Sequence, residues 1–138
     1  EATGIDVDIP GAGAAGGFPS AFLAFTDAGI EPGFELIAAL VGLEPALSRA
    51  DLVLSGEGSI DEQSRFGKAP LEVARLAADR GIPVVLVAGA ITLGPKVLAE
   101  YGVEAAVSVL DLAQSPEDAM ARAAFYVARA TQAALEGA

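Results

Sequence analysis

The sequence predicts an α/β fold in three layers, in which a parallel β-sheet is covered by helices on both faces. The first observation is that short apolar runs alternate with helical patterns from residue 51 to the end of the 138-residue chain. Strands that alternate with helices favour parallel pairing through right-handed crossovers. The second observation is the valine-rich run PVVLVAG at 83–89, which is typical of a strand buried on both faces.

The first 50 residues are predicted to be helical. The segment 11–29 begins with several glycines and continues with phenylalanines at helical spacing, and Gly29 is expected to end this helix. A second helix is predicted over 32–42, followed by one short helical turn within 43–50. The phenylalanines at helical spacing are Phe18, Phe22 and Phe25.

Three strands and three helices are expected beyond residue 50. The strands are predicted at 51–55, 83–89 and 105–110, and the helices at 69–80, at 94–101 and from 115 onward. Ser115 is expected to cap the last helix, with Pro116 at its first position and Asp118 in its first turn. Its buried stripe is predicted to consist of Met120, Ala123, Ala124, Val127, Thr131 and Ala134.

Charge and composition exclude several classes of function. Eight basic and nineteen acidic residues give a formal charge of −11, which repels phosphate backbones and anionic lipids and argues against nucleic acid and membrane partners. The chain has no Cys and no His, which excludes thiolate chemistry, Ser-His-Asp triads and the common zinc sites. A bound metal should therefore be a hard ion such as Mg²⁺. No membrane span is visible in the sequence, and a cytoplasmic protein is expected.

The stretch SGEGSIDEQSRFGKAP at 55–70 is the most polar of the three loops expected at the carboxyl ends of the strands, where α/β proteins bind ligands. Its glycines allow close backbone approach. Glu57 and Asp61 could hold Mg²⁺ or orient a hydroxyl group. Gly67 and Lys68 lie where the next helix begins, and free N–H groups there favour an anion. A long solvated loop explains the same composition.

Neither glycine cluster matches a known nucleotide motif well. Eight residues separate Gly58 from Gly67, whereas a Walker A loop needs four. The spacing G-x-G-x-x-G beginning at Gly11 lacks the βαβ unit of a dinucleotide fingerprint. A helix start that packs closely against a neighbour explains this second cluster equally well.

Taken in order, GAGAAGG, ADLVLSGEGSIDEQSRFGKAP and GIPVVLVAGAI resemble the bacterial glycerate kinase family of the two-domain type. The central pattern is G-E-G-x-[hydrophobic]-D-x-Q-[S/T]-x-x-G-K. The resemblance covers essentially the whole chain, but members of the family are considerably longer, so the chain resembles their C-terminal part. The matching residues are Gly56, Glu57, Gly58, Ile60, Asp61, Gln63, Ser64, Gly67 and Lys68.

The resemblance implies a fold and an activity. Residues 51–138 would close a Rossmann-like domain, and residues 1–50, with their Gly-rich loop, would lie near the return from a second, inserted domain. The implied reaction is ATP-dependent phosphorylation of D-glycerate, with Mg²⁺, most simply at the 2-hydroxyl to give 2-phosphoglycerate. Phosphoryl transfer of this kind needs positioning and charge neutralisation and no His or Cys.

The resemblance also implies roles for individual residues. Asp61 would be the base or a magnesium ligand, Glu57 would support it as a second ligand, and Lys68 would hold a phosphate or the glycerate carboxylate. Residues expected to bind substrate or nucleotide are Gly13, Gly16, Gly17, Gly56, Gly58, Gln63, Ser64 and Gly67.

Two alternatives stay open at this point: a non-catalytic α/β ligand-binding domain, and an inert structural fragment. A three-stranded sheet leaves edges that something should cover, so the expected partners are the missing N-terminal part of the same protein or a second copy in a homodimer. Without that part, the fragment is expected to be inactive.

Overall fold

The computed structural model describes residues 4–137, which fall into two compact units divided between Leu36 and Ile37. These units follow from compactness alone, so the functional division expected after residue 50 stays a prediction. The short helix α2 (Gly33–Leu40) spans the point of division.

The first unit contains one helix, α1 (Ala14–Phe25), within the residues that the structure describes. Its first turns are irregular, because three consecutive residues, Ala15 to Gly17, have positive φ angles. The prediction that Gly29 ends this helix is wrong. The helix ends at Phe25, and the cap residue Thr26 has a hydroxyl that donates to the carbonyl oxygen of Phe22 at 2.7 Å and competes with continued helical pairing.

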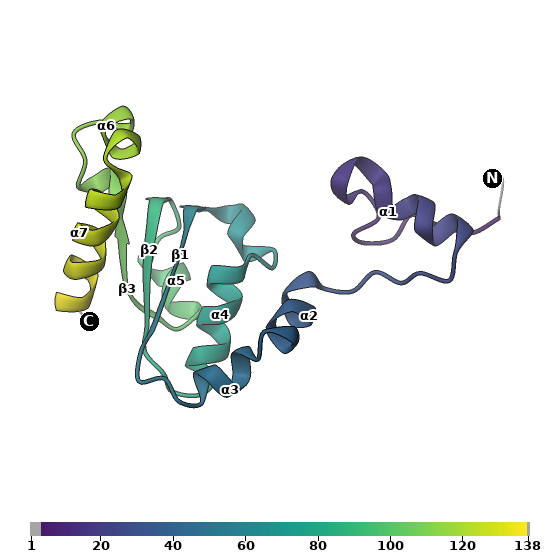
Figure 1. Ribbon diagram of the computed structural model, residues 1–138, viewed down its shortest axis with the longest axis horizontal. Coiled ribbons are helices and arrows are strands. Elements are labelled where there is room, and N and C mark those ends of the chain that lie inside the picture. The colour runs from purple at the N-terminus through teal and green to yellow at the C-terminus, as the bar shows by residue number, and fades with distance from the viewer. Residues whose placement is uncertain (1–3, 138) are drawn as a thin grey trace. The chain divides into compact units, whose positions relative to one another are not determined.

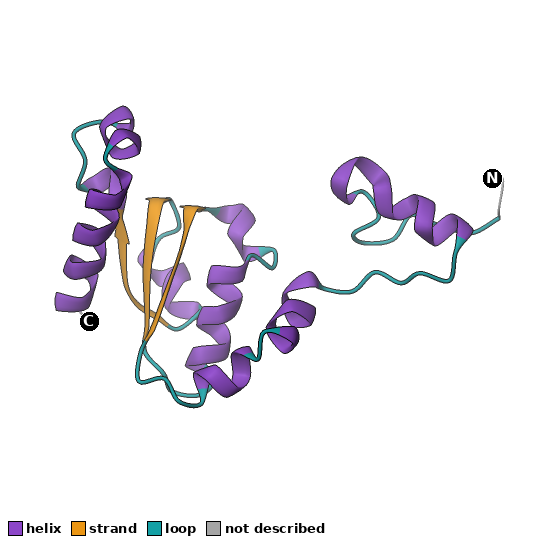
Figure 2. Cartoon of the chain, viewed as in Figure 1, coloured by secondary structure: helices purple, strands orange, loops and turns teal. Residues whose placement is uncertain are grey.

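The second unit is an α/β sandwich, drawn in Figure 1 with its elements labelled and in Figure 2 by type of secondary structure. Its helices after α2 are α3 (Leu43–Leu47), α4 (Ala69–Ala78), α5 (Pro95–Glu100), α6 (Pro116–Ala121) and α7 (Ala123–Glu136). Its strands are β1 (Val53–Ile60), β2 (Val84–Ile91) and β3 (Val103–Ser108). Two short 3₁₀ turns, η1 (Glu62–Arg65) and η2 (Val109–Asp111), follow β1 and β3.

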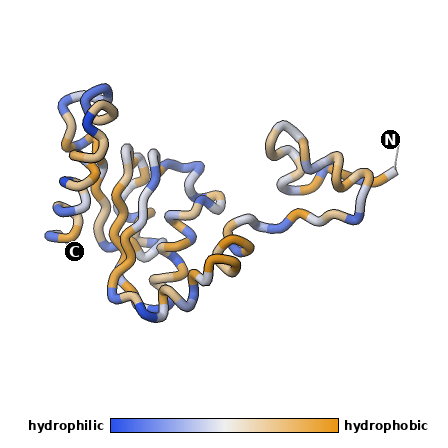
Figure 3. Tube along the Cα trace, viewed as in Figure 1, coloured by the Kyte–Doolittle hydropathy of each residue, from blue (hydrophilic) through white to orange (hydrophobic). Residues whose placement is uncertain are grey.

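The sheet of the second unit is parallel and has the order β1-β2-β3. Side chains on β2 alternate between two cores. Val84 and Leu86 face the core shared with α4 and α5, whereas Val85 and Val87 face the core shared with α7. Figure 3 shows the strongly hydrophobic trace of β2 in the middle of the sheet. The predicted three-layer α/β fold is therefore confirmed.

The strand boundaries differ from those predicted, most clearly for the first and the third strand. The first strand was expected to end at residue 55 but continues to Ile60, because residues 53–60 pair in register with β2 despite two glycines. The loop expected over 55–70 is therefore shorter, and Glu57 lies on a strand. The third strand begins at Val103, two residues before the predicted start, and 109–111 form a 3₁₀ turn.

The prediction of a single long helix from residue 115 is wrong. The helical segment breaks at Arg122, where φ is −121° and ψ is 35°. The predicted cap is confirmed: the backbone N–H of Asp118 donates to Ser115 Oγ at 3.2 Å. At the break, the Asp118 carboxylate accepts two hydrogen bonds of 2.8 Å from the Arg122 guanidinium and one from the Tyr126 hydroxyl. These contacts hold the pKa of Asp118 well below its ordinary value.

The break also changes which residues of the last helices are buried. Met120, at 81% exposed, and Val127 were both assigned to the buried stripe and lie outside it. The side chains that pack on the sheet are Ala119, Tyr126, Ala130 and Ala134, of which only the last was predicted. Among residues 4–137, none of the helices is long and apolar enough to cross a membrane.

Candidate functional site

The candidate site begins where β1 ends, with Asp61 as the cap of the turn η1. One oxygen of this carboxylate, Oδ1, accepts hydrogen bonds from the backbone N–H groups of Gln63 at 2.9 Å and Ser64 at 3.2 Å. In return, Ser64 Oγ accepts from the N–H of Asp61 at 3.1 Å, which completes a capping box. The box fixes the position of the Asp61 carboxylate at the carboxyl edge of the sheet.

Ser64 belongs to the interior of this turn, with only 1% of its surface exposed. Its hydroxyl is also within 3.4 Å of the carbonyl oxygen of Ser59 and of Asp61 Oδ1. A buried hydroxyl with this set of partners stabilises the turn. In this structure Ser64 therefore supports Asp61, and its predicted contact with substrate or nucleotide stays a prediction.

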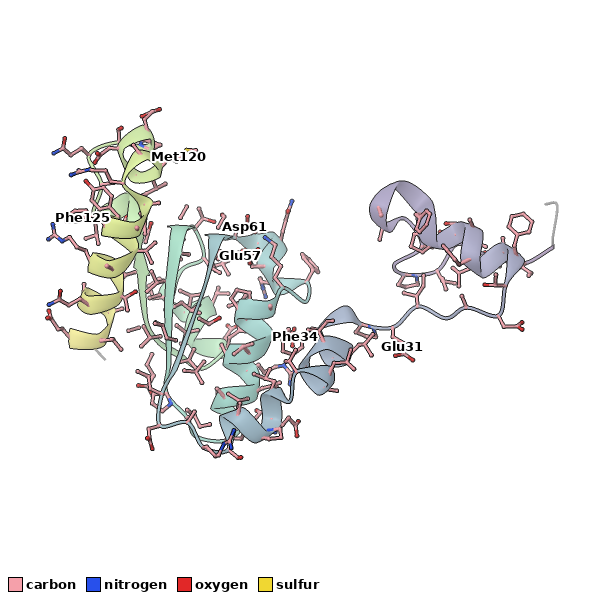
Figure 4. All side chains as sticks on the ribbon, in the orientation of Figure 1. Glu31, Phe34, Glu57, Asp61, Met120 and Phe125 are labelled. Atoms are coloured by element: carbon pink, nitrogen blue, oxygen red, sulfur yellow. The ribbon has the colours of Figure 1, made fainter. Side chains whose placement is uncertain are left out.

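Lys68 brings the two acidic side chains of the motif together. Its ammonium lies 3.8 Å from Asp61 Oδ1 and 4.0 Å from Glu57 Oε1. Figure 4 labels Glu57 and Asp61, which lie close together beside the end of β1. All three side chains are about one-third exposed, at 39% for Glu57, 34% for Asp61 and 32% for Lys68. The three predicted catalytic residues thus form one cluster that is open to solvent.

The surroundings of Asp61 favour its ionised form. Removal of water from around the carboxyl group acts to raise its pKa, but the charge of Lys68 and the hydrogen bonds from Ser64 and Gln63 together lower the pKa below the ordinary value. The carboxylate is therefore charged at neutral pH, as a metal ligand or a proton acceptor has to be.

Two glycines let β1 and β2 approach each other closely. A Cβ atom at Gly56 would lie 1.9 Å from the carbonyl oxygen of Val87, and one at Gly89 would lie 2.5 Å from that of Gly58. Strand pairing therefore requires glycine at position 56, and the predicted contact of Gly56 with substrate or nucleotide stays a prediction. By contrast, a Cβ at Gly58 would meet no atom within 4 Å.

The remaining residues predicted for the site lie in different places. Gln63 is exposed on η1, and Gly67 has a φ of +82° just before α4. Gly13, Gly16 and Gly17 belong to the first unit, where the last two have positive φ angles and open space around them. Contact between these three glycines and a ligand stays a prediction.

One residue that the sequence analysis did not single out is Phe66, which lies between the cap and the lysine and is 86% exposed. A single exposed apolar side chain is common on protein surfaces, so its position two residues before Lys68, and not its exposure, makes Phe66 a candidate for ligand contact. In the sequence, the feature that could have drawn attention to Phe66 is that it is the single aromatic residue within a polar motif. The N–H of Thr92 donates to the carbonyl oxygen of Ile60 at 2.9 Å, which ties the ends of β1 and β2 together.

The donors of the cluster suit a hard divalent cation. Mg²⁺ commonly binds through one or two carboxylates and completes its shell with water and substrate phosphates. Glu57 and Asp61 supply two such carboxylates, and each has an oxygen within 4.0 Å of the Lys68 ammonium. Within residues 4–137, no group of three or more acidic side chains could hold a metal ion, so further oxygens would have to come from water or a ligand.

The fold and the cluster together define an α/β protein with an acid–lysine site at the carboxyl edge of a parallel sheet, the edge where this class binds ligands. Comparison with known proteins is more specific. The model of the glycerate kinase family matches residues 1–136. The chain therefore belongs to the glycerate kinase family.

Relatives in this family are considerably longer than the chain. It is 41% identical to a glycerate kinase of Halalkalibacterium halodurans over 81% of this chain and 30% of that protein. It is 38% identical to the glycerate 2-kinase of Escherichia coli over 93% of this chain and 34% of that protein. The chain thus spans about a third of the length of these relatives, in agreement with the predicted partial character.

A solved structure gives the same picture. The protein in that structure is provisionally designated glycerate kinase 2 and comes from Salmonella typhimurium LT2. It is 38% identical to this chain, and the two structures superpose with a TM-score of 0.53. The match covers 73% of this chain and 24% of that one.

Proposed function

We propose that the chain supplies the acid–lysine part of the active site of a glycerate kinase that transfers phosphate from ATP to D-glycerate. The observation that carries this proposal is the convergence of Glu57, Asp61 and Lys68 on one point at the carboxyl edge of the sheet. Membership of the glycerate kinase family supports the substrate class. The name of the relative from Escherichia coli, glycerate 2-kinase, favours the 2-hydroxyl as the acceptor.

Asp61 is assigned the central role because its position is the best fixed. With Oδ1 held by backbone N–H groups, Oδ2 has one long hydrogen bond, 3.4 Å from Ser59 Oγ. This oxygen is available to accept a proton from the attacking hydroxyl or to bind Mg²⁺. The ion would neutralise charge on the transferred phosphate, and Glu57 is the second carboxylate within reach of the same point.

Lys68 is assigned to the anionic groups of the ligands. It is the residue that precedes α4, a ten-residue helix whose first N–H groups have no partners within the helix. An ammonium beside the positive end of a helix favours a phosphate or a carboxylate. The left-handed Gly67 and the exposed Phe66 lie directly before it and could contact the same ligand.

A non-catalytic ligand-binding domain remains the alternative, because the same edge of the sheet could hold a nucleotide or an acid without turnover. The two carboxylates favour the kinase, since a binder of anions gains nothing from acidic side chains that repel its ligand. An inert fragment is the third possibility. Because the chain spans about a third of its relatives, we expect it to show no turnover alone.

The test is made in a complete enzyme. We expect Asp61→Asn, placed at the matching position of the full-length glycerate kinase of Halalkalibacterium halodurans, to lower kcat by several powers of ten. The substitution removes the charge but keeps the size and the capping ability of the side chain. Asp79→Asn at its matching position is the control, because Asp79 is an exposed residue at the far end of α4. Near-normal turnover by the Asp61→Asn enzyme would refute the assignment.

A further inference from the structure

One face of the strand β1 lacks a covering layer. Leu54 is 49% exposed, although it pairs with Val85, which is fully buried in the core shared with α7. The helix α7 packs on β2 and β3, and among the described residues β1 contributes no side chain to that core. Figure 1 shows α7 beside β3, whereas the contacts of β1 on its other face are with α4. Parallel sheets occur almost only with both faces covered, so a layer over Leu54 is missing.

The same strand has a free edge. Within residues 4–137, β1 pairs with β2 on one side and has no strand on its other side. Residues 53–56 carry no charge, although edge strands are commonly protected by charged side chains or proline. The opposite edge strand, β3, carries the exposed Glu104 and packs on both α5 and α7. An uncharged edge and an uncovered apolar face therefore occur together on β1.

We propose that β1 is the strand on which the rest of a full-length glycerate kinase packs, with a strand added at its free edge and a layer over Leu54. The chain spans about a third of the length of its relatives, so the remainder of such an enzyme is large enough to supply both. A second copy of this chain is disfavoured as the occupant, because each copy carries a formal charge of −11 and the two would repel each other.

An added strand would place the acid–lysine cluster between two strand ends. In doubly wound sheets, ligands bind beyond the carboxyl ends of the strands, at the point where the order of the strands reverses. Asp61 directly follows β1, so the loop after a parallel strand on this edge would lie beside its carboxylate. The inference rests on the family membership that also supports the proposed function, and not on the catalytic roles proposed for the cluster.

Hydrogen exchange tests which edge of the sheet is covered. Protection factors are compared between this chain and the full-length glycerate kinase of Halalkalibacterium halodurans, at the segments that match β1, β2 and β3. We expect the β1 segment to gain roughly tenfold or more in protection in the full-length enzyme, because edge amides exchange through local openings that pairing suppresses. The strand β2 is paired on both sides and corrects for the difference in overall stability, and β3 is the matched edge.

Three results of the exchange experiment would overturn the inference. The first is no gain at β1 beyond that of β2, and the second is a gain at β3 alone. The third is strong protection of β1 in this chain by itself, because the edge would then be covered by other residues of the chain or by a second copy. Sedimentation of the chain distinguishes these last two occupants.

A substitution on the uncovered face provides an independent test. Leu54→Lys should shift the thermal transition of this chain by less than about 3 °C, because the side chain is half exposed. Lys at the matching position of the full-length enzyme should lower the transition by about 5 °C or more, because it buries an unpaired charge. The control is Lys at the position of Ala106, which is exposed on β3 and should be tolerated in both proteins.

Equal shifts for Leu54→Lys in the two proteins would contradict the inference, as would a larger loss at the position of Ala106 in the full-length enzyme. Neither experiment measures turnover. A failure of the kinase assignment would therefore leave both results unchanged, and a failure of this inference would leave the Asp61→Asn experiment unchanged.

Discussion

Asp61 combines two tasks in one side chain: it caps the turn η1 and it provides negative charge at the candidate site. The cap uses Oδ1, which accepts from two backbone N–H groups, and the ion pair with Lys68 is directed at the same oxygen. An exposed ion pair contributes little to stability. At this residue, stability should therefore depend on the cap, and function on the charge.

Two substitutions of Asp61 separate these tasks. Asn caps about as well as Asp, so Asp61→Asn should change the free energy of unfolding by less than about 0.5 kcal/mol, whereas Asp61→Ala should cost about 1 kcal/mol. Urea denaturation at pH 7 measures both values. If Asn destabilises the chain as much as Ala does, the ion pair with Lys68 contributes more than its exposure suggests, and this division of tasks is wrong.

At the scale of the elements, the pairing of β1 with β2 carries the site, because it places Glu57 on a fixed strand immediately before the cap. This pairing depends on Gly56, where an added Cβ would overlap the carbonyl oxygen of Val87 at 1.9 Å. Backbone on a paired central strand cannot move away as the end of a flexible side chain can.

We therefore expect Gly56→Ala to lower the free energy of unfolding by about 2–3 kcal/mol, the upper range for overpacking a well-packed site. Gly58→Ala is the matched control on the same strand, because it meets open space and its φ angle is not positive. Chemical denaturation of both variants provides the comparison. Similar losses for the two variants would show that strand propensity, and not the close approach to Val87, decides the effect.

The elements also show what the sequence could and could not predict. The order of strands and helices, the parallel sheet and the cap by Ser115 followed from local patterns that the structure keeps. The end of β1 did not, because residues 56–58 have low strand propensity and only pairing with β2 holds them extended. The prediction of the buried face of the last helix was wrong. The break at Arg122 rotates the residues that follow it about the helix axis and turns Tyr126 toward the sheet.

The candidate site was predicted in the same uneven way. The presence of Glu57, Asp61 and Lys68 in one motif at the edge of the sheet was predicted, whereas the contact of Lys68 with both acids was not. The burial of Ser64 was not, since a capping box depends on the orientation of one hydroxyl, and the sequence motif suggests an accessible serine equally well.

At the scale of the whole molecule, both hydrophobic cores lie within the second unit. Every buried member of the two cores falls between Leu47 and Ala134. In the first unit the phenylalanines of α1 are largely exposed, from 47% for Phe22 to 74% for Phe25. The two units should therefore differ widely in their contribution to stability, since burial of apolar surface is the dominant favourable term in folding.

This difference predicts that residues 33–138, from the start of α2 onward, fold without the preceding segment. We expect their thermal transition to lie within about 4–8 °C of that of the complete chain, a change that corresponds to roughly 1 kcal/mol in a domain of this size. Circular dichroism melts of the two chains measure it, with Leu86→Ala in the longer chain as a reference for the loss of a core side chain. Because Leu86 is fully buried, that variant should lose about 2–5 kcal/mol and melt much lower. If the shorter chain melts as low as Leu86→Ala, residues 4–32 contribute to the core of the second unit, and the two units are energetically one.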